Sequence, residues 1–227
     1  MHLPISDKIE LNILHQNSHQ AEKNKVKFNN YNLLCLNIMS SPGAGKTRLL
    51  EITLEDLSKK FHSAVLEGDM TTNLDAARLE KLNIPVVPIT TGRACHLDAN
   101  MVSGGLKLLE KKINPDLLDI LLVENVGNLV CPAEFEIGEH FKVALLSITE
   151  GEDKPLKYPI MFREADLILI TKVDLLPHLN FDINELKSNI ASTNPKADVI
   201  EISSITKSGF ELWQDWISKK ILKFKSI

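Results

Sequence analysis

The amino-acid sequence predicts an α/β fold with a mainly parallel central sheet flanked by helices, and with an appended helix at the N-terminus. Two observations carry this prediction. From Leu33 onward, short apolar runs alternate with helical patterns, which is typical of parallel strands joined by helices. Before that point, residues 1–32 are polar, and their few apolar residues follow a helical spacing.

The expected elements follow one another along the chain. The strands are Leu33–Met39, Ala64–Glu67, Val86–Ile89, Leu117–Glu124, Val143–Ile148, Asp166–Ile170 and Asp198–Ile202. The first expected helix runs over roughly Asp7 to Lys27, with Ile9, Ile13, Leu14 and Ala21 on its apolar face. The other expected helices are Lys46–Lys60, Asn73–Leu82, Asp98–Lys112, Ile183–Ser192 and Ser208–Lys223. Ligands of parallel sheets bind beyond the carboxyl ends of the strands, so the residues that directly follow each strand are the candidates for chemistry.

Composition favours a soluble globular protein of the cytoplasm. With 227 residues, 44% of them apolar, the chain can bury a sizeable core, and we divide it into a helical extension, 1–32, and one domain, 33–227. A net charge of −4 provides no basic excess for binding nucleic acid or a membrane surface. The N-terminus has no apolar core of signal-peptide length, and the most apolar stretches, such as Leu33–Met39, are too short to span a bilayer. Three cysteines are too few for a disulfide scaffold and indicate reduced thiols.

The segment Ser40–Thr47 has the form of a phosphate-binding loop. The strict pattern of Gly, four residues and Gly-Lys-Ser/Thr fails at Ser40, but an apolar strand precedes the segment and a helix follows it. Glycines in the loop let backbone amides curl inward, and the helix N-terminus faces the phosphates. The alternative is a structural glycine turn. The context predicts the P-loop NTPase fold, with nucleotide contacts from Ser41, Gly43, Ala44, Gly45, Lys46, Thr47 and Arg48.

Within this loop, Lys46 is expected to reach the β- and γ-phosphates, and the Thr47 hydroxyl to bind Mg²⁺. Two further carboxylates follow strands. Asp69 is expected near the γ-phosphate, where it can bind Mg²⁺ or orient water, and Glu124 is expected to hold Mg²⁺. Gly127 would offer its amide to the γ-phosphate. The alternative for both acids is a solvated loop carboxylate.

The segment Thr171-Lys172-Val173-Asp174 resembles the guanine-reading Asn-Lys-x-Asp motif, with Thr in the first place. The carboxylate of Asp174 can accept hydrogen bonds from N1 and N2 of guanine, a donor pair that adenine lacks, and the stem of Lys172 can lie along the base. After the last strand, Ser203 and Ser204 begin a segment similar to the Ser-Ala-Lys loop that contacts the guanine O6. These cues favour GTP over ATP, although Thr171 leaves the strictness of base selection open.

A thiol and an imidazole stand side by side at Cys95 and His96, just before a predicted helix, and Cys131 follows Gly127 closely. These side chains suit nickel or zinc equally. Three ligands are fewer than a closed zinc site needs, so the site would be open and labile, or shared across a symmetric dimer. The alternative is a structural role, which we assign to Cys35 within the first strand.

Together these segments resemble one family, the HypB nickel-insertion GTPases of NiFe-hydrogenase maturation, which are related to the urease accessory GTPase and are SIMIBI-type P-loop GTPases. The similarity covers nearly the whole chain from Ile9. Its segments are Ser40–Thr47, Glu67–Asp69, Asp75–Arg78, Gly92–Met101, Glu124–Pro132, Glu150–Pro159 and Lys172–Pro177. The blocks around Cys95 and Cys131 are the most specific.

The resemblance implies a slow, regulatory GTPase with a nucleotide-dependent homodimer, using GTP/GDP, Mg²⁺ and Ni²⁺ or Zn²⁺. It implies a metal site of Cys95, His96 and Cys131 at the dimer interface, and Lys154 near the nucleotide. It also implies delivery of nickel to the hydrogenase large-subunit precursor with an accessory maturation protein. Residues 1–32 hold neither the cysteine cluster nor the histidine-rich tract of many members, so tight nickel storage is not expected.

Three other functions remain open at the level of sequence. The client could be another nickel enzyme, such as urease. The chain could be a P-loop small-molecule kinase with structural cysteines, for which ATP preference would be the mark. It could also be a scaffold that binds GTP only to dimerise, against which phosphate release would count.

Overall fold

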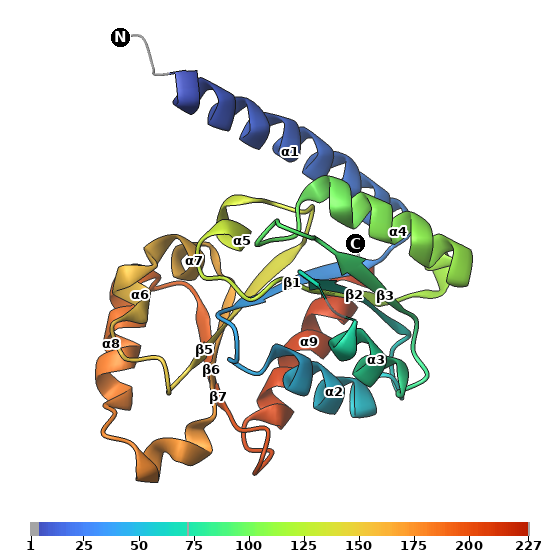
Figure 1. The fold of residues 1–227 in the computed structure, drawn as a ribbon. Coiled ribbons are helices and arrows are strands. Elements are labelled where there is room, and N and C mark those ends of the chain that lie inside the picture. The colour runs from blue at the N-terminus through green and yellow to red at the C-terminus, as the bar shows by residue number, and fades with distance from the viewer. Residues whose placement is uncertain (1–4, 72, 227) are drawn as a thin grey trace.

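The computed structural model describes residues 5–71 and 73–226, and its centre is a seven-stranded, wholly parallel sheet in the order β3-β2-β4-β1-β5-β6-β7 (Figure 1). The strands are β1 Leu34–Ser40, β2 Ser63–Asp69, β3 Val86–Thr90, β4 Ile120–Glu124, β5 Phe141–Ser147, β6 Leu167–Thr171 and β7 Asp198–Ile202. The predicted parallel α/β fold is therefore confirmed.

Helices cover both faces of the sheet. The α-helices are α1 Ile5–Asn30, α2 Lys46–Leu57, α3 Leu74–Glu80, α4 Ala99–Lys112, α5 Cys131–Glu134, α6 Lys154–Lys157, α7 Pro159–Glu164, α8 Ile183–Thr193 and α9 Phe210–Lys225, and two 3-10 segments are η1 Pro115–Leu117 and η2 Val173–His178. Helices α2, α3 and α9 pack on one face. On the other, α1 and α4 lie over one half of the sheet and α5, α7 and α8 over the other half.

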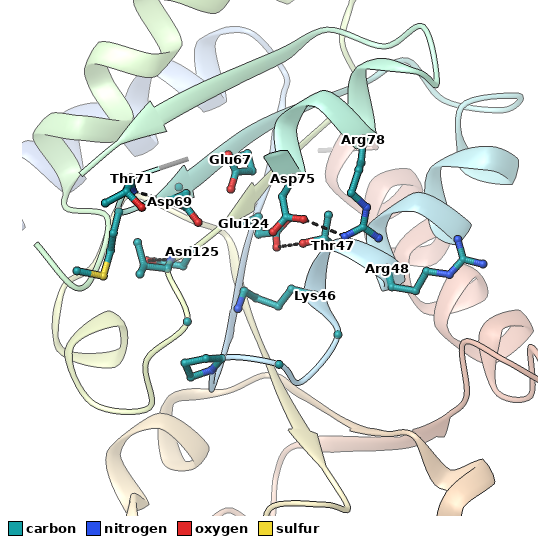
Figure 2. Close-up of a pocket in the computed structure, with 17 residues that line it drawn as sticks. Lys46, Thr47, Arg48, Glu67, Asp69, Thr71, Asp75, Arg78, Glu124 and Asn125 are labelled. Carbon is teal, nitrogen blue, oxygen red and sulfur yellow. Dashed lines mark hydrogen bonds and ion pairs between the residues drawn. The ribbon is translucent and has the colours of Figure 1, made fainter. Parts of the chain in front are cut away.

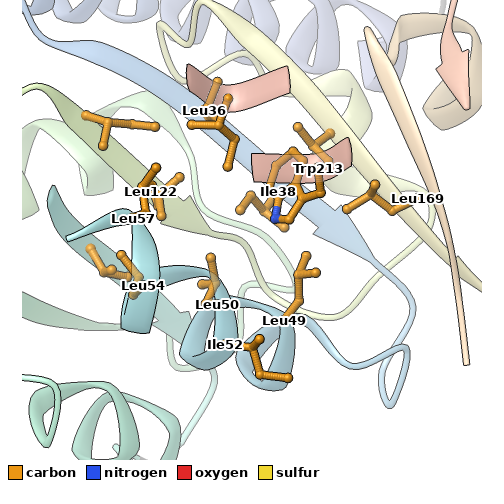
Figure 3. Packing of buried hydrophobic residues seen from close by; sticks show 14 of the residues in the cluster. Leu36, Ile38, Leu49, Leu50, Ile52, Leu54, Leu57, Leu122, Leu169 and Trp213 are labelled. Atoms are coloured by element: carbon orange, nitrogen blue, oxygen red, sulfur yellow. The ribbon is translucent and has the colours of Figure 1, made fainter. Parts of the chain in front are cut away.

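Side chains that alternate along the strands supply the buried apolar clusters on both faces of the sheet. In β1, Leu36 and Ile38 point into the core under α2 and α9, where they pack near Leu50 (Figure 3). Trp213 of α9 is fully buried there, and its indole N–H donates to Thr53 Oγ1 at 2.9 Å. This pairing satisfies two buried polar groups at once, so α9 is fixed against α2 and thereby supports the helix that begins at the phosphate loop.

The structure corrects two details of the predicted elements. Leu117 was expected to begin a strand, but it lies in η1 and is 60% exposed, because the Asn114 side chain accepts the Asp116 N–H and starts a tight turn. The strand begins only at Ile120. The short helices α5, α6 and α7 were not predicted, since segments of 4 to 6 residues carry no helical periodicity.

The N-terminal helix is present, but its expected apolar face is only partly right. Ala21 is buried as predicted, whereas Ile13 is 51% exposed. The side chain of Ile9 lies outside the described part of the chain. The other buried residues of the described helix are Phe28 and two asparagines, Asn17 and Asn24, whose side-chain amides donate to backbone carbonyls of the domain. Among the described residues, no helix has both the length and the apolar character that crossing a bilayer requires.

Candidate nucleotide and metal site

The loop between β1 and α2 has the backbone of a phosphate cradle. Gly43 and Gly45 have φ of 77° and 99°, values that favour glycine, and Gly45 caps α2. The ammonium of Lys46 is buried and donates to Ser40 Oγ at 2.8 Å. Burial lowers the pKa of Lys46. Ser40 therefore serves as a partner for the lysine at the position where the strict motif has glycine.

A cavity of about 540 Å³ opens in front of this loop, at the carboxyl ends of β1, β2 and β4 (Figure 2). Its lining includes Pro42, Gly43, Gly45, Lys46, Thr47 and Arg48 of the loop and helix, and Asp69, Glu124 and Gly127 from the other predicted segments. Ser41 and Ala44 belong to the same loop but are buried beside it. The sheet thus brings the predicted phosphate and Mg²⁺ residues together.

Two buried carboxylates lie side by side at the floor of the cavity. Glu67 of β2 and Glu124 of β4 are register partners and are 2% and 4% exposed. The Thr47 hydroxyl donates to Glu124 Oε1 at 2.7 Å, while the Oε2 atoms of both acids accept no hydrogen bond from the described chain. Burial, with repulsion from neighbouring acids, raises the pKa of Glu67 to about 8, and burial raises that of Glu124 to about 7.

This donor set fits Mg²⁺, because a hydroxyl and carboxylate oxygens are the ligands that the ion prefers. Asp69 ends β2 at the rim, where its Oδ1 accepts the Thr71 N–H at 2.8 Å. Gly127 packs against the loop so closely that a Cβ atom would lie 2.9 Å from Pro42 Cα. Only glycine allows this approach, which keeps the Gly127 backbone next to the phosphate cradle.

Three charged residues that also line the cavity, Glu67, Asp75 and Arg78, had no separate role in the prediction. Arg78 of α3 donates from Nε and Nη2 to the Glu51 carboxylate of α2, both at 2.9 Å, and from Nη1 to Asp75 Oδ1 at 2.9 Å. Glu67 could have been recognised as a candidate site residue, because it stands at the end of a predicted buried strand. Nothing in the local pattern of Arg78 indicated its partner on another helix.

The predicted base-reading residues gather at the ends of β6 and β7. Ser203 Oγ donates to Asp174 Oδ1, and Lys172 adopts a left-handed conformation with φ of 61°. Thr171 does not face a base edge, because its hydroxyl donates to the Ala44 carbonyl of the phosphate loop at 2.8 Å. Lys172, Asp174, Ser203, Ser204 and Lys154 of α6 are not part of the described cavity lining. Asp174 and Ser203 lie together through their hydrogen bond, beyond the strand end at which Thr171 is joined to the phosphate loop.

Cys95 and His96, from the loop before α4, come together with Cys131 at the start of α5, and the ligand atoms all lie within 4.8 Å of one another. The two Sγ atoms lie 3.0 Å apart as free thiols, and His96 Nδ1 lies 3.9 Å from Cys95 Sγ. The His96 ring packs on Phe135 at a centroid distance of 4.0 Å. Burial raises the pKa of Cys131 and lowers that of His96. Two thiols and a half-buried imidazole can hold nickel or zinc.

Asn125 lies between the two sites. It follows β4 and lines the cavity, and its side-chain oxygen accepts the N–H of Leu97, the residue after His96, at 2.9 Å. Its amide nitrogen donates to Asn37 Oδ1 of β1 at 3.1 Å. A buried side chain therefore connects the strands that carry the phosphate loop and Glu124 with the loop that carries Cys95 and His96.

Known proteins share this architecture. A family model described as "CobW/HypB/UreG, nucleotide-binding domain" matches residues 34–201. Hydrogenase maturation factor HypB of Azotobacter vinelandii is 48% identical over 214 residues, which cover 94% of this chain and 69% of that protein. The crystal structure of HypB from Helicobacter pylori in complex with nickel is similar with a TM-score of 0.87 and 40% identity, covering 92% of this chain and 96% of that one. The crystal structure of HypB from Archaeoglobus fulgidus has a TM-score of 0.84 and a sequence identity of 37%, and the match covers 91% of this chain and 99% of that one.

Proposed function

Since the chain belongs to the CobW/HypB/UreG family of nucleotide-binding proteins, we propose that it is a GTP-hydrolysing metallochaperone that binds nickel and delivers it to the large-subunit precursor of NiFe-hydrogenase. One observation carries the proposal. Asn125 lines the nucleotide cavity and also bonds the backbone beside His96. A change at the phosphates can therefore reach the metal ligands through one buried side chain.

GTP would bind with its phosphates in the loop of Gly43, Gly45 and Lys46. Mg²⁺, held by Thr47, Asp69 and Glu124, would neutralise charge on the β- and γ-phosphate oxygens. Gly127 would offer its amide to the γ-phosphate, and loss of that phosphate would release the segment that leads to Cys131. Arg48 and Arg78, the arginines of the described cavity lining, both pair with Glu51. Because neither is presented to the γ-phosphate, hydrolysis is expected to be slow.

Guanine would be read by Asp174, which Ser203 holds by a hydrogen bond. The carboxylate matches the N1 and N2 donors of guanine, and the Lys172 stem and Ser204 would complete the base site. Lys154 would act near the nucleotide, contributed within one subunit or across the dimer. Thr171 supports the phosphate loop through Ala44, so base selection would rest on Asp174.

Nickel, or zinc, is the cargo of Cys95, His96 and Cys131. Three ligands leave coordination positions open, so the ion can be passed on, or a nucleotide-dependent homodimer can share ligands about its twofold axis. Transfer would require the accessory maturation protein and the precursor as partners. The protein would work in the reducing cytoplasm, where its three cysteines stay free thiols and those of the metal site stay available to nickel.

The test is a titration of the full chain with Ni²⁺ and with Zn²⁺, in GDP and in a non-hydrolysable GTP analogue, with the molecular mass followed by light scattering. We expect the metal affinity and the dimer fraction to differ between the two nucleotides. Equal metal affinity in both states would contradict the coupling. Tighter binding of ATP than of GTP would instead favour a kinase with structural cysteines, and unmodified GTP after prolonged incubation would favour a non-catalytic scaffold.

A further inference from the structure

Two buried asparagines of α1 contact both segments that carry the metal ligands. Asn17 is 5% exposed, and Asn24 is 2% exposed. Buried amides are costly unless they are hydrogen-bonded, so their partners show what the helix is built to hold. Those partners are backbone groups shortly after His96 and shortly after Cys131.

Asn17 bridges the two segments with its single amide group. Its Oδ1 accepts the N–H of Ala99, the third residue after His96, at 2.9 Å. Its Nδ2 donates to the carbonyl of Glu136, the fifth residue after Cys131, at 2.7 Å. One side chain therefore joins the start of α4 to the loop that follows α5.

Asn24, two helical turns further along α1, makes the same connection again. Its Nδ2 donates to the carbonyl of Ala99 at 2.7 Å and to that of Ile137 at 3.0 Å. Gln20 of the same helix donates to Asn24 Oδ1 at 2.9 Å and so orients the amide. Both backbone polar groups of Ala99 are thus bonded by α1.

Apolar packing supports the same contact. Phe28 of α1, Leu97 beside His96 and Ile137 belong to one buried cluster. Gly138 lies so close to the helix that a Cβ atom there would meet the Ala21 carbonyl oxygen at 2.5 Å. The loop after Cys131 therefore fits tightly against the helix backbone.

We propose that α1 positions the metal site: Asn17 and Asn24 hold the Cys95/His96 segment and the Cys131 segment at the spacing that a shared ion requires. This inference rests on the proposed function. The ligands come from segments 36 residues apart in sequence, yet their sulfur atoms lie 3.0 Å apart. Residues that orient metal ligands without touching the ion typically change metal affinity by about 10- to 100-fold when removed.

The test uses the full chain with Asn17→Ala and with Asn24→Ala. We expect each variant to bind Ni²⁺ and Zn²⁺ about tenfold more weakly in competition with a chelator, with GTP affinity within about twofold of the unmodified chain. The matched control is Asn12→Ala, which removes an exposed asparagine of the same helix that bonds Gln16. Measurements are made below the thermal transition of each variant, so that loss of positioning is separated from loss of fold.

A second readout needs no metal ion. An aryl arsenoxide reacts with two adjacent thiols, forming two As–S bonds and one water molecule, while arsenic remains As(III). Cys35 is fully buried, so the Cys95/Cys131 pair is the reactive one, and Cys131→Ala serves as the blank. We expect slower and weaker capture by Asn17→Ala and Asn24→Ala than by Asn12→Ala.

The outcomes separate the inference from the function. Variants that match the unmodified chain in both arsenical capture and metal affinity would overturn the positioning role of α1. If the unmodified chain captures the arsenical but binds neither Ni²⁺ nor Zn²⁺, the proposed function fails, and the variants still decide the inference through the thiol readout.

Discussion

The side-chain oxygen of Asn125 accepts the backbone N–H of Leu97 at 2.9 Å, and the same oxygen accepts the N–H of Val126 at 2.9 Å. One atom therefore holds the residue after His96 together with the segment that leads from Glu124 to Gly127. Asn125 is 1% exposed. Because the site is buried, a shift of one segment either moves the other segment with it or leaves a backbone N–H without a hydrogen-bond partner.

Asn125→Ala is expected to uncouple metal binding from nucleotide state. The ratio of nickel affinities in GDP and in a GTP analogue should approach one, because the shared acceptor is gone; couplings of this kind are typically about 5- to 150-fold. The unpaired Leu97 N–H should also cost about 1–3 kcal/mol of unfolding free energy. The measurements are nickel titration in both nucleotides and chemical denaturation.

The control for that experiment is Asn114→Ala, which removes an exposed amide whose oxygen accepts the Asp116 N–H before β4. It should leave the ratio of affinities unchanged. An Asn125→Ala protein that kept the full ratio would show that coupling does not pass through this contact.

Removal of any one metal ligand should abolish tight metal binding. Cys95→Ser, His96→Ala and Cys131→Ser each leave two ligands, and we expect losses greater than the roughly 100-fold upper range for supporting residues. Cys35→Ala is the matched control, since this thiol is fully buried in β1 and outside the cluster. Chelator competition gives the affinities; a ligand variant that binds as tightly as Cys35→Ala would remove that residue from the site.

Asp174→Asn should change the preferred base. The amide no longer accepts both hydrogen bonds from guanine N1 and N2, so GTP affinity should fall by at least about tenfold, given 1.5–3 kcal/mol for a hydrogen bond to a charged group. The amide N–H₂ can instead donate to the O2 of xanthine, so xanthosine triphosphate should bind better than GTP. Asp215→Asn, on exposed α9 surface beside Lys219, should bind GTP normally. Unchanged selectivity would exclude Asp174 as the base reader.

The stability of the nucleotide-free protein should fall as pH rises from about 4.5 to about 8. Burial raises the pKa of Glu67 from 4.5 to about 8 and that of Glu124 to about 7. The folded state then holds more protons than the unfolded state across this interval, so deprotonation costs folding free energy. Mg²⁺ prefers the ionised carboxylates, so the stabilisation by added Mg²⁺ and GTP should grow over the same range.

Thermal unfolding in EDTA between about pH 5 and 8 measures this slope. Glu67→Gln keeps the shape of the side chain but cannot ionise, so it should flatten the decline, whereas Glu55→Gln on the exposed surface of α2 should not. Equal slopes for the two variants would mean that Glu67 does not titrate in this range.

Much of this protein could be predicted from local sequence. The phosphate loop around Lys46 and the seven strands could be predicted from short-range patterns of apolar residues, glycine and turn residues. Such patterns depend only on residues close together in the sequence. The pairing of Cys95 and His96 was visible for the same reason. Only the placement of Cys131 beside them needed the fold, which brings the sulfur atoms to 3.0 Å.

The sequence alone could not determine which side chains meet across different strands and helices, because strand register and helix packing set these contacts. The partnership of Glu67 with Glu124 depends on how β2 pairs with β4, and that of Arg78 with Glu51 depends on how α3 lies on α2. No role was predicted for Asn17 and Asn24, because an amide in a polar stretch carries no sign of its distant partners. They are buried because α1 packs on α4. A buried amide is tolerated there because backbone N–H and C=O groups of Ala99 form hydrogen bonds with it.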